Sequence, residues 1–217
     1  MKIFHNAYLQ IFKSQPVTIL EIGSRDGDDA ELMRALSEAH PLNVFIVEPH
    51  PESYKKIIEK YPQFRTFELA VSDKTGVVDF NAIPYAVADP GHVGTSSLLK
   101  KEMMIYMRSG GRVNVENWVK VLAVTGQTIL QLSNRFEMDL VKIDVEGMTY
   151  EVLKSFGNDL RLLKMLHLEV ELIQVWEDQQ TFEKIKEYLK FYGFQELYYA
   201  PKYLGGNQGD SVWRRLD

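Results

Sequence analysis

Residues 139–147, DLVKIDVEG, are the most informative segment of this chain. An apolar run over residues 140–145 is interrupted by Lys142 and Asp144, and Glu146 follows where the run ends. A buried strand tolerates few charges, because an unpaired charge in an apolar medium is strongly unfavourable. A strand that ends in two carboxylates is therefore expected to direct them into a cleft. In open α/β sheets that cleft lies at the carboxyl ends of the strands.

The segments around this strand alternate between strand and helix patterns joined by short links, which is typical of a parallel sheet with crossover helices. Further strands are expected at residues 17–22, 43–47, 64–71, 77–83, 113–124, 164–172, 194–199 and 211–216. Helices are expected at residues 30–39, 51–60, from 125, at 148–156 and at 182–192, with Asp28 or Asp29 capping the first. The fold class is therefore predicted to be α/β, with a mostly parallel sheet, helices on both faces and an antiparallel C-terminal hairpin.

The composition suits one domain over residues 1–217, since 217 residues with 45% hydrophobic content can bury one substantial core. A short N-terminal helix is expected over residues 1–14, and a loop region beside the active site over residues 84–112. The net charge of −5 argues against nucleic-acid binding by phosphate neutralisation. The absence of cysteine excludes a thiolate zinc site and fits a cytoplasmic location. No apolar run reaches the roughly 20 residues needed to cross a bilayer, so no membrane partner is expected.

Residues 19–29, ILEIGSRDGDD, lie where the first expected strand turns into the first helix. Gly23 and Gly27 allow the backbone to approach a ligand closely. Glu48 ends the second strand, where an acid can bind both ribose hydroxyls of a cofactor. An adenosine-type cofactor is therefore expected across the first two strands.

The charges of this loop distinguish between such cofactors. A dinucleotide places its pyrophosphate at the helix N-terminus and prefers three glycines there, whereas this loop has two glycines and carries Glu21, Asp26, Asp28 and Asp29. These acids would repel a pyrophosphate and attract the ammonium and sulfonium of S-adenosylmethionine, and Arg25 could hold its methionine carboxylate. The alternatives are an NAD(P)-dependent oxidoreductase or epimerase, a non-catalytic nucleotide-binding module, or an ordinary turn with solvated acids.

The chain resembles FkbM-type S-adenosylmethionine-dependent methyltransferases in five segments that cover roughly residues 17–172. These are ILEIGSRDGDD, EPHPESYKKI from Glu48, LAVSDKTGVVDF from Leu69, the triplet Ser96-Ser97-Leu98, and DLVKIDVEGMTYEVLK from Asp139. The last segment is the most specific of the five. The resemblance implies a Rossmann-like class I methyltransferase fold and methyl transfer to a hydroxyl oxygen of a small molecule or glycan.

The expected cofactor-binding residues follow from the loop and from the resemblance. Those expected at the methionine end are Glu21, Gly23, Ser24, Arg25, Asp26 and Gly27, with Asp144 close by. Those expected beside the ribose are Glu48, Pro49 and His50, and those beside the adenine are Val71, Ser72 and Asp73. Family members often have a small or amide residue at the position of Arg25, so contacts at the methionine end are expected to differ here.

A base that accepts the hydroxyl proton would assist methyl transfer to an alcohol. The four candidates are Asp144, Glu146, His167 and Glu169. In an extended backbone Asp144 and Glu146 point to opposite sides, and so they are expected to have different roles. His167 and Glu169 lie two residues apart and share a face. The alternatives are a helix cap for Asp144, a helix-dipole role for Glu146, a hydrogen-bonded core position for His167 and a structural ion pair for Glu169.

No metal is expected, although Asp144, Glu146 and Glu169 offer the oxygen ligands that Mg²⁺ prefers. Ser96 and Ser97 are expected to contact the substrate in a loop that closes over it, and the alternative is a connector without a role. The oligomeric state and the identity of the acceptor are left open by the sequence.

Overall fold

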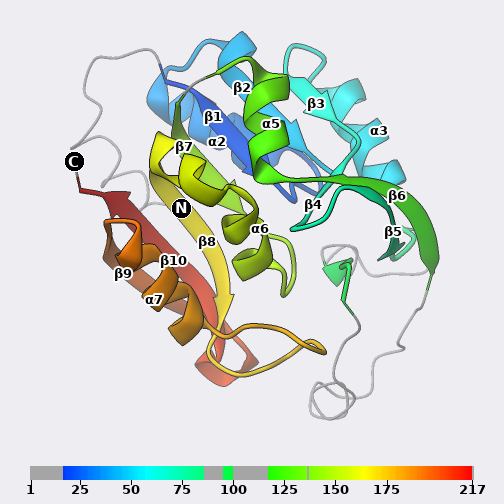
Figure 1. Cartoon of the computed structure of the whole chain (residues 1–217). Coiled ribbons are helices and arrows are strands. Elements are labelled where there is room, and N and C mark those ends of the chain that lie inside the picture. The colour runs from blue at the N-terminus through cyan, green and yellow to red at the C-terminus, as the bar shows by residue number, and fades with distance from the viewer. Residues whose placement is uncertain (1–16, 86–94, 100–116, 136, 217) are drawn as a thin grey trace.

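The computed structural model describes residues 17–85, 95–99, 117–135 and 137–216, and its centre is a seven-stranded sheet (Figure 1). The strands are β1 (Ile19–Ile22), β2 (Val44–Val47), β3 (Arg65–Phe67), β7 (Met138–Ile143), β8 (Leu163–Glu171), β9 (Phe194–Tyr203) and β10 (Gln208–Arg215). Their order is β3-β2-β1-β7-β8-β10-β9. The first five in this order pair in parallel, while β10 pairs antiparallel with β8 and β9. The predicted mostly parallel sheet with an antiparallel C-terminal hairpin is confirmed.

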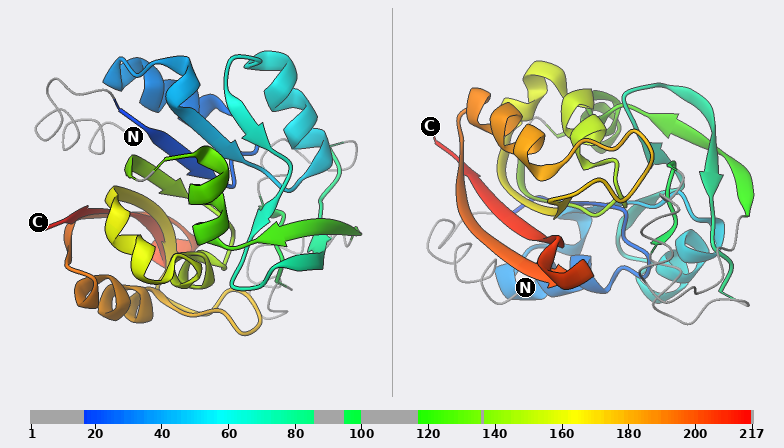
Figure 2. Two further views of the ribbon diagram at one scale, coloured as in Figure 1. Left: turned by 45° about the horizontal axis from the view of Figure 1, so that its top comes forward. Right: turned by 90° about the horizontal axis from the view of Figure 1, so that it is seen from below.

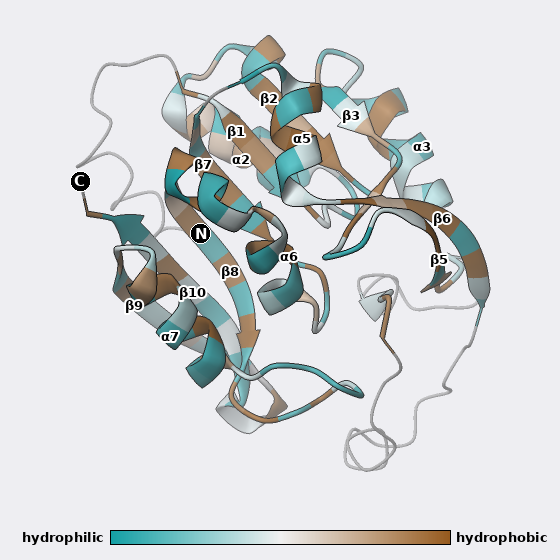
Figure 3. Cartoon of the chain, in the orientation of Figure 1, coloured by the Kyte–Doolittle hydropathy of each residue, from teal (hydrophilic) through white to brown (hydrophobic). Residues whose placement is uncertain are grey.

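Helices cover both faces of this sheet, as Figure 2 shows from two further directions. One face packs against α5 (Gly126–Ser133), α6 (Thr149–Ser155) and α7 (Phe182–Phe191). The other packs against α2 (Asp28–Ser37) and α3 (Pro51–Lys60). Strands β1, β2 and β7 are buried along their whole length, as expected for parallel strands covered on two sides. The hydropathy colouring shows their apolar character (Figure 3).

Three short 3₁₀ helices complete the connections between these elements in the described ranges: η1 (Pro41–Asn43), η3 (Gly157–Leu162) and η4 (Leu204–Gly206). The last of these lies in the turn that joins β9 to β10. No helix of the described ranges is long and apolar enough to cross a membrane.

A second, smaller sheet lies at the end of the molecule opposite the C-terminal strands (Figure 2). It contains β4 (Ala70–Val71), β5 (Gly76–Asn81) and β6 (Trp118–Val124) in the order β4-β6-β5. The prediction of one strand over residues 64–71 was wrong, because β3 pairs with β2 whereas β4 pairs with β6 in the other sheet. The predicted strand over residues 113–124 appears as β6, and residues 113–116 lie outside the described ranges.

Helices α5 and α2 begin in different ways. Helix α5 begins after Thr125, whose hydroxyl accepts the Thr128 N–H at 3.2 Å. At α2 the predicted Asp28 or Asp29 cap was wrong, because Gly27 occupies the N-cap with a left-handed φ of 79°. Both acids therefore lie in the first helical turn, where their side chains are free to contact other elements. The predicted helix over residues 1–14 lies outside the described ranges, as does most of the 84–112 loop region.

Candidate active site

A cavity of about 620 Å³ opens where β1, β2, β7 and β8 end, the position at which open α/β sheets bind ligands. Its walls come from the loops after β1, β2 and β7, from residues 69–71 and 95–98, and from the hairpin formed by β9 and β10. Among the described residues, eight carboxylate side chains and three lysine or arginine side chains line it. The cavity is therefore strongly acidic.

The turn after β1 lies directly against strand β7. The Gly23 N–H donates to the Val47 carbonyl at 2.9 Å, and its φ is +78°. A Cβ atom at Gly23 would lie 1.9 Å from the Asp144 carbonyl oxygen. Glycine is thus required at position 23 because Asp144, which directly follows β7, lies against it. This requirement holds whether or not a ligand also approaches the loop.

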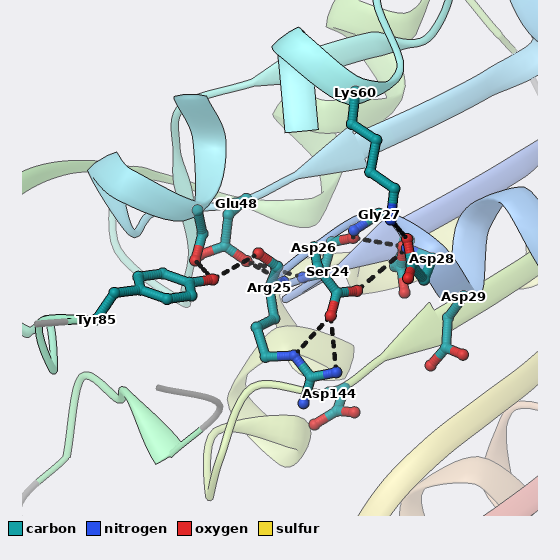
Figure 4. A network of polar contacts seen from close by, with 12 residues as sticks. Ser24, Arg25, Asp26, Gly27, Asp28, Asp29, Glu48, Lys60, Tyr85 and Asp144 are labelled. Atoms are coloured by element: carbon teal, nitrogen blue, oxygen red, sulfur yellow. Dashed lines mark hydrogen bonds and ion pairs between the residues drawn. The ribbon is translucent and has the colours of Figure 1, made fainter. Parts of the chain in front are cut away.

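Glu48 holds this loop to the end of β2. Its Oε2 accepts the N–H groups of Ser24 and Arg25 at 2.9 and 2.8 Å (Figure 4). Its Oε1 accepts the His50 N–H at 2.8 Å. Burial raises the pKa of Glu48, and these three backbone hydrogen bonds oppose that rise. A carboxylate offers about four acceptor positions, so about one remains for a ligand hydroxyl.

Arg25 and Tyr85 form the outer edge of the loop. The Arg25 guanidinium donates to Asp26 Oδ2 from Nε at 3.0 Å and from Nη2 at 2.8 Å, and the side chain extends toward Asp144 (Figure 4). A cofactor carboxylate bound by Arg25 would therefore compete with Asp26. The Tyr85 hydroxyl donates to the Arg25 carbonyl at 3.3 Å and shares a hydrogen bond with Ser53 at 3.1 Å. Tyr85 was not identified from the sequence, because no motif distinguishes it within the 84–112 region.

Glu21 lies beneath the loop and is fully buried. Ser24 Oγ donates to its Oε2 at 2.6 Å, and the Lys142 ammonium lies 3.5 Å from its Oε1. Burial raises the pKa of Glu21 to about 7, despite the lowering effect of Lys142 and Ser24. Glu21 does not line the cavity, so its position supports the loop rather than a ligand.

Asp144, Glu146 and Glu169 converge on the cavity. One carboxylate oxygen from each lies within 4.8 Å of the other two. The prediction that Asp144 and Glu146 point to opposite sides was wrong, because β7 ends at Ile143 and Glu146 adopts a left-handed φ of 47°. The alternation of an extended strand therefore does not apply at this point.

A hydrogen bond from Ser97 and the close approach of Trp176 to Gly147 fix the turn after β7. The Ser97 hydroxyl donates to the Glu146 carbonyl at 2.6 Å. Gly147 has a φ of +91°, and a Cβ atom there would lie 2.5 Å from the buried Trp176 ring. The Ser97 side chain is buried and also accepts the Leu99 N–H at 3.0 Å, so it stabilises this turn without lining the cavity.

The surroundings shift the pKa values of two of these acids in opposite directions. Burial, and then the Asp144, Glu146 and Glu171 carboxylates, raise the pKa of Glu169 well above its ordinary value. Burial opposes ionisation of Asp144, but the Lys142 ammonium, 2.9 Å from its Oδ2, outweighs that effect and lowers the Asp144 pKa. Asp144 is therefore the member of the pair that ionises first as the pH rises, and Glu169 keeps its proton to higher pH.

His167 and Glu169 share a face of β8, as predicted, and the structure places both in the cavity lining. The buried His167 places Nε2 3.2 Å from Asp210 Oδ2, and Lys202 contacts the same carboxylate. Burial opposes ionisation of Asp210, but His167 and Lys202 lower its pKa to about 2. The contact with Asp210 corresponds to the alternative of a hydrogen-bonded histidine.

The remaining predicted residues divide between the cavity and the scaffold. Pro49, His50, Val71 and Ser96 line the cavity, whereas Ser72, Asp73 and Ser97 do not. The Ser96 hydroxyl accepts the Ile83 N–H at 3.0 Å. The Ser72 N–H donates to the Val124 carbonyl at 3.0 Å, which holds this residue against the smaller sheet, directly after β4.

The spacing of Asp144, Glu146 and Glu169 is also one that a single divalent cation could bridge. Asp144 also contacts the Lys142 ammonium at 2.9 Å, so a cation bound here would share this carboxylate with Lys142.

The parallel sheet, the glycine turn after β1, the acid after β2 and the acidic cavity together define an S-adenosylmethionine-dependent methyltransferase. The cavity residues fit this cofactor, because carboxylates favour its sulfonium and ammonium groups. The chain belongs to the methyltransferase FkbM domain family, whose model matches residues 21–196.

Known proteins agree with this assignment. The 2-O-methyltransferase NoeI of Sinorhizobium fredii is 23% identical over 223 residues, which cover 97% of this chain and 84% of that protein. The structure of the methyltransferase FkbM from Methylobacillus flagellatus KT has a TM-score of 0.56 and 8% identity, over 97% of this chain and 47% of that one. Magnesium protoporphyrin IX methyltransferase from Synechocystis PCC 6803, solved with bound S-adenosylmethionine, has a TM-score of 0.52 and 11% identity, over 99% and 77% of the two chains. These two structures share the fold of this chain.

Proposed function

We propose that this methyltransferase transfers a methyl group to a hydroxyl oxygen of a small molecule or glycan, with Asp144 as the general base. The observation that carries this proposal is the acid pair in the cavity, in which the Lys142 ammonium lies 2.9 Å from Asp144 and lowers its pKa, while burial raises the pKa of the neighbouring Glu169. An alcohol is a weak nucleophile, and a carboxylate within the cavity could accept its proton. The relative named a 2-O-methyltransferase supports oxygen as the acceptor atom.

The residues of the loop after β1 would hold the methionine end of the cofactor, and Glu48 and His50 would lie beside its ribose. Bound S-adenosylmethionine supplies an electrophilic methyl group on a sulfonium. The acceptor would enter from the side of β8 and the hairpin, where Glu169, Lys202 and Asp210 line the cavity. Asp144 would take the hydroxyl proton, and the Glu169 proton would stabilise the charge on Asp144 before that step.

Calorimetric titration with S-adenosylmethionine, S-adenosylhomocysteine and NAD tests the cofactor half of this proposal. We expect binding of the first two and none of NAD. A panel of sugars and hydroxylated metabolites, followed by mass spectrometry, then tests for a methyl ether. Methyl transfer to nitrogen or carbon alone would refute the proposal.

Asp144→Asn tests the base, and Asp139→Asn is its matched control. Asp139 lies on β7, the strand that leads to Asp144, and also contacts a lysine, Lys164, at 2.9 Å, but it lies outside the cavity. We expect Asp144→Asn to lower kcat on the order of 100-fold, within the range that general-base catalysis contributes, while Asp139→Asn affects stability alone. Equal kcat for the two variants would remove Asp144 from this role.

A further inference from the structure

Lys142 is a charged residue near the carboxyl end of the central strand β7. The register of the sheet places it beside Glu21 on β1 and His167 on β8, so the three share one face. Its side chain is only 9% exposed. A lysine at such a position is strongly unfavourable unless carboxylates surround its ammonium group.

Three carboxylates meet that requirement, and they come from three different elements. The Lys142 Nζ lies 2.9 Å from Asp144 Oδ2, 3.0 Å from Asp29 Oδ2 and 3.5 Å from Glu21 Oε1. Asp29 lies in the first turn of α2, directly after the cofactor loop, and Asp144 directly follows β7. One ammonium thus joins the helix after the cofactor loop to the carboxylate of the acid pair.

Other charged groups face this cluster from the elements around it. Glu169 and His167 approach from β8, Asp210 from β10, and Glu146 and Arg25 from the loops after β7 and β1. Arg25 is bound by Asp26, and Asp210 by Lys202 and His167. Among the described residues, Lys142 forms an ion pair with Asp144.

We propose that Lys142 is a positioning residue for methyl transfer, which holds the Asp144 carboxylate ionised and oriented into the cavity. This inference rests on the proposed function of Asp144. Without the ammonium, Asp144 and Glu169 are two adjacent carboxyl groups that oppose each other's ionisation, and no neighbouring cation then favours ionisation of Asp144 over that of Glu169.

Carbon-13 NMR of the Asp and Glu side-chain carboxyls tests this in the protein saturated with S-adenosylhomocysteine at pH 7. The Asp144 and Glu169 signals are assigned with Asp144→Asn and Glu169→Gln. In the parent protein we expect an ionised signal for Asp144 and a protonated signal for Glu169. In Lys142→Met the separation between the two signals should fall by about half or more as the proton is shared, and Lys142→Arg should restore part of it.

Lys164→Met is the matched control, because Lys164 contacts Glu137 and Asp139 at 2.9 Å on the same pair of strands but outside the cavity. It should lower stability without moving either signal. An unchanged separation in folded Lys142→Met, or an equal change in Lys164→Met, would overturn the proposal. If Lys142→Met does not fold, the Asp29→Asn variant provides the test. Its Lys142 ammonium is no longer shared with Asp29, so the Asp144 carboxyl should titrate at a lower pH than in the parent protein. An unchanged titration midpoint of Asp144 would overturn the proposal.

This readout needs no acceptor, so its failure is distinct from failure of the proposed function. Absence of methyl transfer to any hydroxyl would refute the proposed function whatever the signals show. Methyl transfer with signals that do not depend on Lys142 would refute the positioning role alone.

Discussion

Replacing Gly23 with alanine tests whether the turn after β1 requires glycine because another strand lies against it. A non-glycine residue in the left-handed region, here at φ +78°, costs about 1–2 kcal/mol. The new Cβ would also lie 1.9 Å from the Asp144 carbonyl oxygen and 2.8 Å from the carbonyl carbon. These are backbone atoms that cannot rotate away, and overpacking of this kind costs about 1–3 kcal/mol. We therefore expect Gly23→Ala to lower the free energy of unfolding by about 2–5 kcal/mol.

Gly205→Ala is the matched control for the backbone strain. Gly205 has a similar φ of +66°, but no atom lies within 4 Å of the position of its Cβ. This variant should lose only the strain contribution of about 1–2 kcal/mol. The difference between the two variants then measures the contact with Asp144.

Urea denaturation measures both losses, and calorimetry with S-adenosylhomocysteine measures the effect on the cofactor site. Because the added methyl group displaces the residue that we propose as the base, Gly23→Ala should also lose cofactor affinity. If Gly23→Ala is no less stable than Gly205→Ala and binds as the parent does, the contact with β7 is not what requires glycine.

Three further outcomes are expected. Burial raises the pKa of Glu171 from 4.5 to about 7, so the stability that this group contributes is present below pH 4.5 and is lost as the pH rises to 7. Glu171→Gln should remove up to about 3 kcal/mol of that pH dependence in urea denaturation, and an unchanged slope would contradict it. Glu48→Gln places an amide nitrogen against backbone N–H donors. It should weaken S-adenosylhomocysteine binding on the order of tenfold or more by calorimetry. A change below about threefold would argue against these hydrogen bonds. Treatment with EDTA should leave turnover unchanged, since the Lys142 ammonium already contacts Asp144 at 2.9 Å; a loss restored by Mg²⁺ would show a bound cation.

The central sheet could be predicted because its signals are local. Short apolar runs separated by helical patterns indicate parallel strands wherever they occur, and Thr125 is a local cap. The division of residues 64–71 between two sheets could not be predicted in this way. It depends on β6, which begins at Trp118 and provides the partner for Ala70 and Val71.

Lys142 shows a second limit of local patterns. In the sequence it interrupts an apolar run, and its importance appears only when β1 lies beside β7. That register brings it to Glu21, which is 121 residues away along the chain. A buried lysine within a strand that ends in acids was nevertheless a signal, because such a lysine must have a carboxylate partner.

The orientation of Asp144 and Glu146 shows where a correct rule was applied beyond its range. Alternation holds only while the backbone is extended, and β7 ends at Ile143, one residue before Asp144. The Glu-Gly pair at the end of the run was a usable signal for a turn, since Gly147 permits a positive φ of +91° and its missing Cβ leaves room for the buried Trp176 ring. The acids converge because the chain leaves the sheet at this point. A site of this kind is therefore best predicted from the residues that end a strand, with their turn preferences, rather than from the strand pattern continued past its end.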